Sequence, residues 1–216
     1  TAKMRIFNAD GSEVEACGNA TRCVALILGE EGHVNATIET AAGLLSAAAH
    51  KDAATVDMGM PSFAWEDIPL AYPMDTSAMP VAWDALANPM AVNVGNPHVV
   101  FFVKDLSAIA LGETGPLIEN DPLFPERVNV NVAQITGPQT LTLQVWERGA
   151  GLTLACGTGA CATAVAAIRQ GRVQSPVTVS LPGGNLIIDW KPGAAIRMTG
   201  PATFVFEGEI DWALFP

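Results

Sequence analysis

The sequence predicts an α+β protein built from two similar halves. Short apolar runs bounded by Gly, Pro, Asn and Asp recur through most of the 216 residues, as in strands joined by tight turns. Each half holds one notable helix pattern, at residues 18–28 and 158–170. Each helix follows a matching motif, "EACGNATRC" at 15–23 and "LACGTGACA" at 154–162. We infer the duplication of one strand–loop–helix unit.

The first half is predicted to surround its helix with short strands. Gly18 begins the helix, and Gly29 is expected to end it. The proline-rich residues 61–90 show no clear period, and we interpret them as a connection between the halves with one short helix at 83–86. The strands expected in this half are 4–8, two runs within 34–50 that turn at Gly43, and 54–60.

The second half repeats this organisation with more strands. An amphipathic helix is expected at 106–111, and Gly171 is expected to end the long helix at 158–170. Because that long helix consists mostly of Ala, Val and Cys, we expect it to be buried. The strands expected in this half are 91–95, 98–103, 126–135, 140–147, 176–181, 185–190, 195–200 and 202–210.

Composition excludes several classes of protein. The formal net charge of −11, from 22 acidic and 11 basic residues, disfavours nucleic acid and anionic membranes as partners. No apolar run is long enough to cross a bilayer and no leader is visible, so we expect a soluble cytoplasmic protein. The chain has four cysteines but no C-x-x-C motif, and its three histidines are far apart. This spacing argues against a zinc site, and the size of the chain argues against structural disulfides.

The two cysteine motifs place one thiol at the start of each helix. A helix N-terminus presents free N–H groups and lowers the pKa of a nearby thiol, so Cys17 and Cys156 are expected to form thiolates readily. The same N–H groups can hold a carboxylate. Two such turns facing each other would enclose one small anionic ligand between two thiols. By contrast, we interpret Cys23 and Cys161, which lie within the helices, as small core hydrophobes.

Two opposed thiols suit the inversion of a stereocentre. One thiolate removes the α-proton of an amino acid, and the thiol on the opposite face returns a proton, so the pair titrates as one coupled system with a bell-shaped rate–pH profile. The other way to acidify this proton is pyridoxal phosphate, which needs a Schiff-base lysine. None of the four lysines lies in a Gly-rich anchoring context, and "CGTGA" lacks the spacing and the lysine of a phosphate loop. We therefore expect neither a cofactor nor a metal.

Five segments carry a resemblance to a known family. They are "RIFNADGSEVEACGNATRC", "VGNPHVVFFV", "FPERVNVNVAQI", "ERGAGLTLACGTGACATAVAA" and "MTGPATFVFEGEI". Together and in this order they resemble diaminopimelate epimerase and cover nearly the whole chain. The resemblance implies a cofactor-independent epimerase that interconverts LL- and meso-diaminopimelate. It also implies two pseudo-symmetric lobes, each an antiparallel strand barrel around a central helix, with the site in the cleft between them.

The resemblance also assigns roles to residues. Cys17 and Cys156 become the two catalytic bases. Backbone N–H groups at the helix starts would come from Gly18, Asn19, Gly157 and Thr158. The distal end of the substrate would be held by Asn8, Asn96, Asn129 and Arg148. Glu147 and the auxiliary His98 would lie near the reacting amino group. The implied lobes are residues 1–61 with 201–216, and residues 62–200.

The chain departs from the family pattern in two places. It begins with Thr1, at the strand before the first cysteine loop, and lacks the opening strands and the Gly-Asn-Asp-Phe motif of the family. We infer an absent N-terminal segment, hence an incomplete first lobe, and leave the activity of this shortened chain open. Ala20 stands where we expect glycine, with little consequence. A small molecule is the expected partner, and a homodimer is left open.

Three alternatives remain. A proline racemase or hydroxyproline epimerase type of enzyme also uses two cysteines, but we expect a Cys-Gly-His turn at the first of them. This chain has Cys17-Gly18-Asn19 instead. Isomerases of the phenazine-pathway type share the fold but lack the cysteine pair. The alternative from a different class is a thiol redox or sensing protein in which Cys17 and Cys156 form a disulfide.

Overall fold

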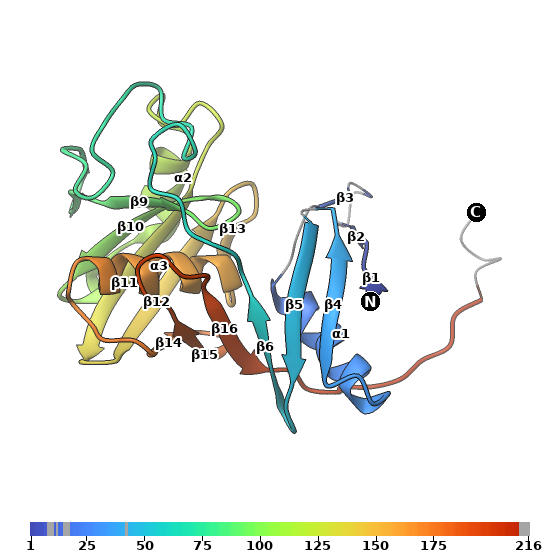
Figure 1. The fold of residues 1–216 in the computed structure, drawn as a ribbon. Coiled ribbons are helices and arrows are strands. Elements are labelled where there is room, and N and C mark those ends of the chain that lie inside the picture. Colours follow the sequence, from blue (N-terminus) through green and yellow to red (C-terminus); the bar gives the residue numbers. More distant parts are fainter. Residues whose placement is uncertain (8–10, 12, 15–17, 42, 212–216) are drawn as a thin grey trace.

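The computed structural model describes residues 1–7, 11, 13–14, 18–41 and 43–211. Most strands join one mixed sheet with the order β1-β4-β5-β6-β16-β15-β14-β12-β11-β10-β9, and β13 pairs with β12. Figure 1 shows two parts along this sheet, one around helix α1 and one around helix α3. This is the predicted α+β fold of two strand-rich lobes, each with one main helix. Among the described residues, no helix is long and apolar enough to cross a membrane.

The first part packs helix α1 (Gly18–Glu30) against three strands. Its core is small and aliphatic, with Ile38, Ala54 and Val56 fully buried. Gly43 turns the chain between two strands with a φ of 116°, as predicted. The strands are β4 (Asn35–Thr40), β5 (Gly43–Ala49) and β6 (Ala53–Asp57), with β1 (Ala2–Lys3) at the sheet edge and β2 (Ile6–Phe7) paired with β3 (Glu13–Val14).

The second part encloses helix α3 (Gly157–Arg169) with strands, as Figure 1 shows. Ten of the thirteen α3 residues are buried, which confirms the burial expected from its composition. Helix α2 (Leu111–Glu119) packs on β11, β12 and β13 over a second core. The strands are β9 (Met90–Asn93), β10 (Pro97–Val103), β11 (Asn129–Gly137), β12 (Thr140–Glu147), β13 (Gly151–Thr153), β14 (Val177–Leu181), β15 (Gly184–Asp189) and β16 (Arg197–Pro201).

One strand pair joins the two parts. Strand β16 pairs antiparallel with β6 over five residues, from Arg197 opposite Asp57 to Pro201 opposite Ala53. Because both strands also pair with neighbours in their own part, the sheet continues without a break. Backbone hydrogen bonds of this kind fix the distance and direction between two strands. The pairing therefore sets where α1 lies relative to α3.

Two predicted helices are wrong. Residues 83–86 form no helix but lie in a hairpin of β7 (Ala82–Trp83) and β8 (Leu86–Ala87), which turns through Asp84 with a φ of 50°. Aspartate tolerates this left-handed conformation in a turn. The helix expected at 106–111 is a short 3-10 turn, η1 (Leu106–Ala108), and α2 begins only at Leu111. Helix α2 was not predicted because "LGETGPLIE" contains two glycines and a proline, which are poor helix formers.

Two further expectations also fail. Gly29 does not end α1, which continues to Glu30. A Cβ at Gly29 would lie 2.4 Å from the Cβ of Ala49, so the missing side chain lets the helix approach β5. Residues 202–210 do not form the expected strand, and they run past the first part as an exposed extended trace (Figure 1). Their alternating apolar pattern is that of a strand, but they have no backbone partner among the described residues.

Two glycines of α2 test how closely this helix packs. A Cβ at Gly115 would lie 2.6 Å from the indole ring of Trp146, whereas a Cβ at Gly112 would make ordinary contact with Leu152 at 3.4 Å. We expect Gly115→Ala to lower the free energy of unfolding by about 1–3 kcal/mol, because the ring has to move. Gly112→Ala is the matched control and should be neutral or stabilise by up to about 1 kcal/mol. Urea denaturation measures both, and equal effects would contradict the close packing.

Candidate active site

The N-termini of α1 and α3 lie close together. The two helices start 139 residues apart (157 − 18) and end 139 residues apart (169 − 30), so the sequence repeat is also a structural repeat. Asn19 in the first turn of α1 donates from Nδ2 to the carbonyl oxygen of Ala155, 3.4 Å away. Ala155 immediately precedes Cys156. The start of one helix therefore contacts the segment that leads into the other.

Glycine at the first position of both helices leaves room for a shared neighbour, the flexible side chain of Met198. A Cβ at Gly18 would lie 2.8 Å from the Met198 methyl carbon, and a Cβ at Gly157 would lie 3.2 Å from the Met198 sulfur. Met198 comes from β16, the strand that joins the two parts. Both helix starts therefore approach the same side chain from opposite parts. Cys17 directly precedes Gly18 in the sequence, but Cys17 and Asn8 lie outside the described residues.

Cys156 is the N-cap residue of α3. Its backbone is extended and its sulfur accepts a hydrogen bond from the backbone N–H of Gly159 at 3.3 Å. The thiol is only 4% exposed, and burial raises its pKa to about 12, with a further contribution from the negative charge of Glu147. The lowered pKa expected for Cys156 is therefore wrong. Loss of hydration destabilises the thiolate by more than the two hydrogen bonds from Thr158 and Gly159 stabilise it.

A chain of hydrogen bonds ends at the Cys156 sulfur. Its steps are Asn131 Nδ2 to His98 Nδ1 at 2.9 Å, His98 Nε2 to Asn96 Oδ1 at 2.8 Å, Asn96 Nδ2 to Thr158 Oγ1 at 3.4 Å, and Thr158 Oγ1 to Cys156 Sγ at 3.5 Å. With Asn131 as the first donor, His98 and Asn96 each accept one hydrogen bond and donate the next. The Thr158 hydroxyl accepts from Asn96, and either this hydroxyl or the Cys156 thiol can donate in the last contact.

His98 is held in its neutral form. The ring has no exposed surface, and burial together with the positive charge of Arg148 lowers its pKa to about 3. A neutral imidazole has one donor and one acceptor nitrogen, which matches its two partners, Asn96 and Asn131. Because both nitrogens are used and the ring is buried, His98 is linked to the cleft through Asn96.

A second group of predicted residues lies where β12 ends. Asn129 connects two elements, because its Oδ1 accepts from the backbone N–H of Arg148 at 2.9 Å and its Nδ2 donates to the carbonyl of Pro97 at 2.8 Å. The Arg148 side chain is exposed, and Glu147 is half-buried and near enough to Cys156 to raise its pKa. Asn129, Glu147 and Arg148 therefore lie beside the hydrogen-bond chain.

A cavity of about 700 Å³ borders part of this group, and its lining does not include Cys156, Asn129, Glu147 or His98. It contains four of the predicted residues, Gly18, Asn96, Arg148 and Thr158. The rest of its lining was not predicted and comes largely from the first part, namely Glu13, Leu44, Leu45, Ser46, Asp57, Met58, Gly59, Val94 and Gly95. The cleft is thus formed by both parts, as the resemblance implied.

Two buried residues of the site were missed from the sequence. Asn131 is fully buried and begins the hydrogen-bond chain, and it lies two positions after Asn129 on the same face of β11. Two asparagines spaced by two within an apolar strand are a signal that could have revealed it. Arg22 is 8% exposed and donates to Asn19 Oδ1 at 3.0 Å, which orients that amide.

The remaining cysteines differ from each other. Cys161 is fully buried in the core around α3, as expected. Cys23 is exposed, so its assignment to the core is wrong. The buried face of α1 passes through Gly18, Thr21, Arg22 and Ala25, and Cys23 lies on the outer face. All three described cysteines are free thiols.

Comparison with known proteins identifies relatives along almost the whole chain. The family model "Diaminopimelate epimerase" matches residues 1–64 and 90–205. A diaminopimelate epimerase of Sphingopyxis alaskensis is 65% identical over 213 residues, which are 99% of this chain and 78% of the relative. A diaminopimelate epimerase of Zymomonas mobilis is 58% identical over 212 residues, which are 98% of this chain and 77% of the relative.

Solved structures show the same fold at low sequence identity. A hydroxyproline epimerase from Agrobacterium vitis is similar with a TM-score of 0.65 at 18% identity, over 92% of this chain and 67% of the other. A phenazine biosynthesis protein of the PhzF family from Bacillus anthracis has a TM-score of 0.66 at 17% identity, over 96% of this chain and 80% of the other. These two matches concern the fold alone and confirm the predicted two-lobe strand architecture.

The lowered pKa of His98 predicts a pH-dependent stability. Between pH 6.5 and about 3 the unfolded chain binds a proton at this histidine that the folded chain does not. The free energy of unfolding should therefore fall as the pH falls, by up to about 1.4 kcal/mol per pH unit beyond other contributions. Denaturation of the wild type and of His98→Gln over this range measures the difference. His33→Gln, at an exposed histidine, should keep the wild-type slope, and a wild-type slope in His98→Gln would contradict the assignment.

The raised pKa of Cys156 predicts slow alkylation. At pH 8 iodoacetamide should modify exposed Cys23 at least about tenfold faster than Cys156, because the thiolate is the reactive form and Cys156 is both protonated and buried. Mass spectrometry of peptides after timed quenching gives both rates. Modification of Cys156 at the rate of Cys23 would mean that its thiol ionises near neutral pH after all.

Proposed function

Because the chain belongs to the diaminopimelate epimerase family, we propose that it interconverts LL- and meso-diaminopimelate in the biosynthesis of lysine and peptidoglycan precursors. The observation that carries this proposal is the approach of two helix N-termini to one methionine, each start directly following a cysteine in the sequence. A reaction that needs one group on each side of a carbon atom requires such an arrangement. Stereoinversion at an α-carbon is such a reaction.

The proposed reaction uses two proton transfers and no cofactor. A thiolate on one side takes the α-proton and becomes a thiol, while the C–H electron pair moves toward the substrate carboxylate. The thiol on the other side then donates its proton to the opposite face of the carbon and becomes a thiolate. The α-carbon is inverted, and the two sulfurs have exchanged protonation states. Cys17 and Cys156 are the residues proposed for these roles.

The helix starts supply the stabilisation that this carbanion needs. Negative charge grows on the substrate carboxylate as the proton leaves, and preorganised N–H donors in a site shielded from water stabilise such charge strongly. Gly18 and Asn19 begin α1, and Gly157 and Thr158 begin α3, so their N–H groups lie in the first turns. We assign these four residues to binding the carboxylate beside the reacting carbon.

The raised pKa of Cys156 suggests which sulfur starts protonated. With a pKa of about 12 this residue is a thiol at neutral pH, which makes it the proton donor in the first turnover. Cys17 would then be the thiolate that removes the proton. After one turnover the charge lies on Cys156, where the hydrogen bonds from the Thr158 hydroxyl and the Gly159 N–H stabilise it.

The distal end of diaminopimelate carries a second carboxylate and a second ammonium group. We assign the carboxylate to the guanidinium of Arg148, because its planar donors match a carboxylate. Asn96 and Asn129 offer amide groups nearby, and Asn8 is assigned to the same end by family resemblance. Glu147 and His98 are assigned to the reacting end, with His98 acting through Asn96.

The proposal includes a reducing location. Cys23, Cys156 and Cys161 are free thiols, as is usual for proteins kept under reducing conditions. A disulfide between Cys17 and Cys156 would remove both proton carriers at once. We therefore propose a cytoplasmic enzyme whose partner is its small-molecule substrate.

Exchange of the α-proton tests this function. The protein, kept reduced, is incubated with LL-diaminopimelate in deuterated water, and loss of the α-proton signal is followed by NMR. We expect exchange together with formation of the meso isomer. Cys156→Ala should reduce the rate by at least about 100-fold, because one of the two acid–base groups is gone.

The remaining cysteines provide matched controls. Cys23→Ala removes an exposed thiol and Cys161→Ala a buried one from the same helix as Cys156, and both should retain exchange. Circular dichroism establishes that each variant is folded. If proline exchanges its α-proton and diaminopimelate does not, a proline racemase type of function replaces the one proposed. Full activity in Cys156→Ala would refute the two-base mechanism.

A further inference from the structure

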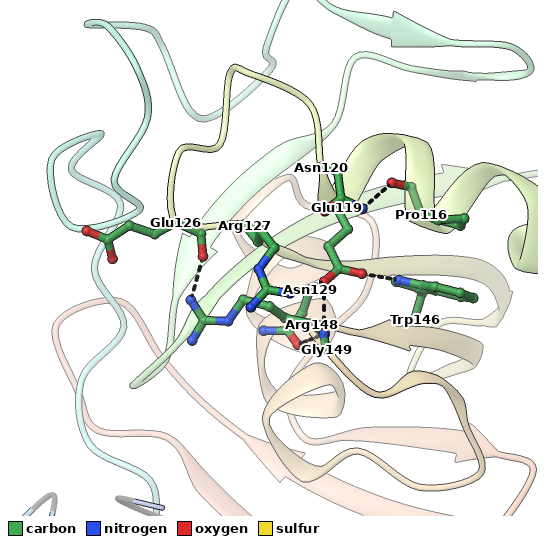
Figure 2. A network of polar contacts seen from close by, with 9 residues as sticks. All are labelled: Pro116, Glu119, Asn120, Glu126, Arg127, Asn129, Trp146, Arg148 and Gly149. Atoms are coloured by element: carbon green, nitrogen blue, oxygen red, sulfur yellow. Dashed lines mark hydrogen bonds and ion pairs between the residues drawn. The ribbon is translucent and has the colours of Figure 1, made fainter.

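A buried carboxylate holds the turn between β12 and β13. Glu119, the last residue of α2, is 5% exposed. Its Oε2 accepts a hydrogen bond from Trp146 Nε1 at 2.7 Å, and its Oε1 accepts one from the backbone N–H of Gly149 at 2.9 Å (Figure 2). Trp146 and Gly149 flank Glu147 and Arg148. One carboxylate therefore holds both ends of the two-residue segment that carries these side chains.

A second route leads from the same carboxylate to the Arg148 side chain. Glu119 Oε1 also pairs with Arg127 Nη1 at 3.4 Å. Arg127 has a left-handed backbone with a φ of 61°, a conformation that needs support in a residue other than glycine. The carbonyl of the preceding residue, Glu126, accepts a hydrogen bond from Arg148 Nη1 at 3.0 Å (Figure 2). Glu119 thus stabilises Arg127, and the neighbouring carbonyl of Glu126 accepts the hydrogen bond from Arg148.

The charges in this network leave Arg148 open to a ligand. The negative charge of Glu119 is matched by Arg127, whose side chain is 54% exposed, while the Glu119 side chain is 7% exposed. No ion pair joins Arg148 to a carboxylate within the described residues. Its guanidinium is exposed and lines the cleft, and one nitrogen is fixed by a neutral carbonyl. The remaining donors are free to meet an incoming carboxylate.

A carboxylate is the group that this position requires. Burial of an ionised side chain is costly unless several donors compensate it, and Glu119 has three donors from three different residues. Both of its oxygens accept hydrogen bonds. A glutamine of the same shape has only one acceptor oxygen, so it cannot satisfy Trp146 and Gly149 together. The substitution Glu119→Gln therefore disturbs the network with little change in volume.

We propose that Glu119 is a positioning residue that presents Arg148 to the distal carboxylate of the substrate. It holds the chain on both sides of the Glu147–Arg148 segment through its contacts with Trp146 and Gly149. It also stabilises Arg127, next to the Glu126 carbonyl that accepts from the Arg148 guanidinium. The identity of the ligand rests on the proposed function. The positioning of Arg148 rests only on the contacts of Glu119 and is measurable without a substrate.

The first experiment measures Arg148 directly. Nitrogen-15 NMR of the arginine Nε–H groups reports the order of each guanidinium, and the Arg148 signal is assigned from its loss in Arg148→Lys. We expect an ordered Arg148 signal in the wild type and an averaged, mobile one in Glu119→Gln. Glu113→Gln, an exposed position on the same helix, is the control and should match the wild type. An Arg148 signal that is equally ordered in Glu119→Gln and Glu113→Gln would overturn the proposal.

The second experiment separates positioning from folding. For the epimerase reaction we expect Glu119→Gln to raise KM for diaminopimelate about tenfold, with kcat changed by less than about threefold, because an interaction made in both ground and transition state is weakened. A purely structural role would lower kcat with the folded fraction and leave KM unchanged, and that result would also overturn the proposal. A wild type without turnover would refute the proposed function, while the NMR comparison would still decide the role of Glu119.

A second variant, at the Trp146 donor, tests the same network in case Glu119→Gln does not fold. Trp146→Phe keeps an aromatic ring against Gly115 but removes the Nε1–H donor to Glu119. It should shift the Arg148 signal and KM in the same direction as Glu119→Gln, by a smaller amount because the Gly149 contact remains. If Glu119→Gln does not fold, Trp146→Phe decides the question by the same two measurements, and wild-type values for both would refute the positioning role.

Discussion

The antiparallel pairing of β16 with β6 is the constraint on which the candidate site depends. Each half has its own core, and neither helix alone could enclose a small ligand. The strand pairing joins both halves into one sheet, and it brings Met198 to the point where α1 and α3 begin. The site is thus a product of backbone hydrogen bonding between residues that are far apart in the sequence. The positions of the side chains in the cleft therefore depend on backbone pairing in the sheet and not on contacts among those side chains.

Around this centre, polar groups form a directional chain of hydrogen bonds. Asn131, His98 and Asn96 each donate to the next group, and the chain ends at the Thr158 hydroxyl beside the Cys156 sulfur. On the other side of Asn129, the Glu119 carboxylate accepts hydrogen bonds from Trp146 and Gly149 and pairs with Arg127, and these contacts hold the segment that carries Arg148. Buried networks are stable only when their members are satisfied, so each network also restricts the side chains at its end to one arrangement. The Cys156 sulfur and the Arg148 guanidinium are therefore oriented by separate networks.

The sequence was informative where local chemistry decides the structure. The repeated cysteine motif predicted both helix starts, because glycine and a small capping residue before a run of helix formers act locally. It could not predict the pKa of Cys156, since burial depends on strands contributed from elsewhere in the chain. The helix at 111–119 was missed because Gly112, Gly115 and Pro116 oppose a helix locally, while packing of Gly115 on Trp146 favours it. Nothing in the sequence indicates the role of Glu119, because its partners Trp146 and Gly149 are distant from it along the chain.

The unequal surroundings of α1 and α3 have an evolutionary consequence. Both helices occupy equivalent places in a duplicated unit, yet α1 leaves an outer face in water and α3 is enclosed on nearly every side. Substitutions on the outer face of α1 change no packed volume, whereas almost any larger residue in α3 meets a neighbouring strand. Over evolution, α3 should therefore accept fewer enlarging substitutions than the outer face of α1.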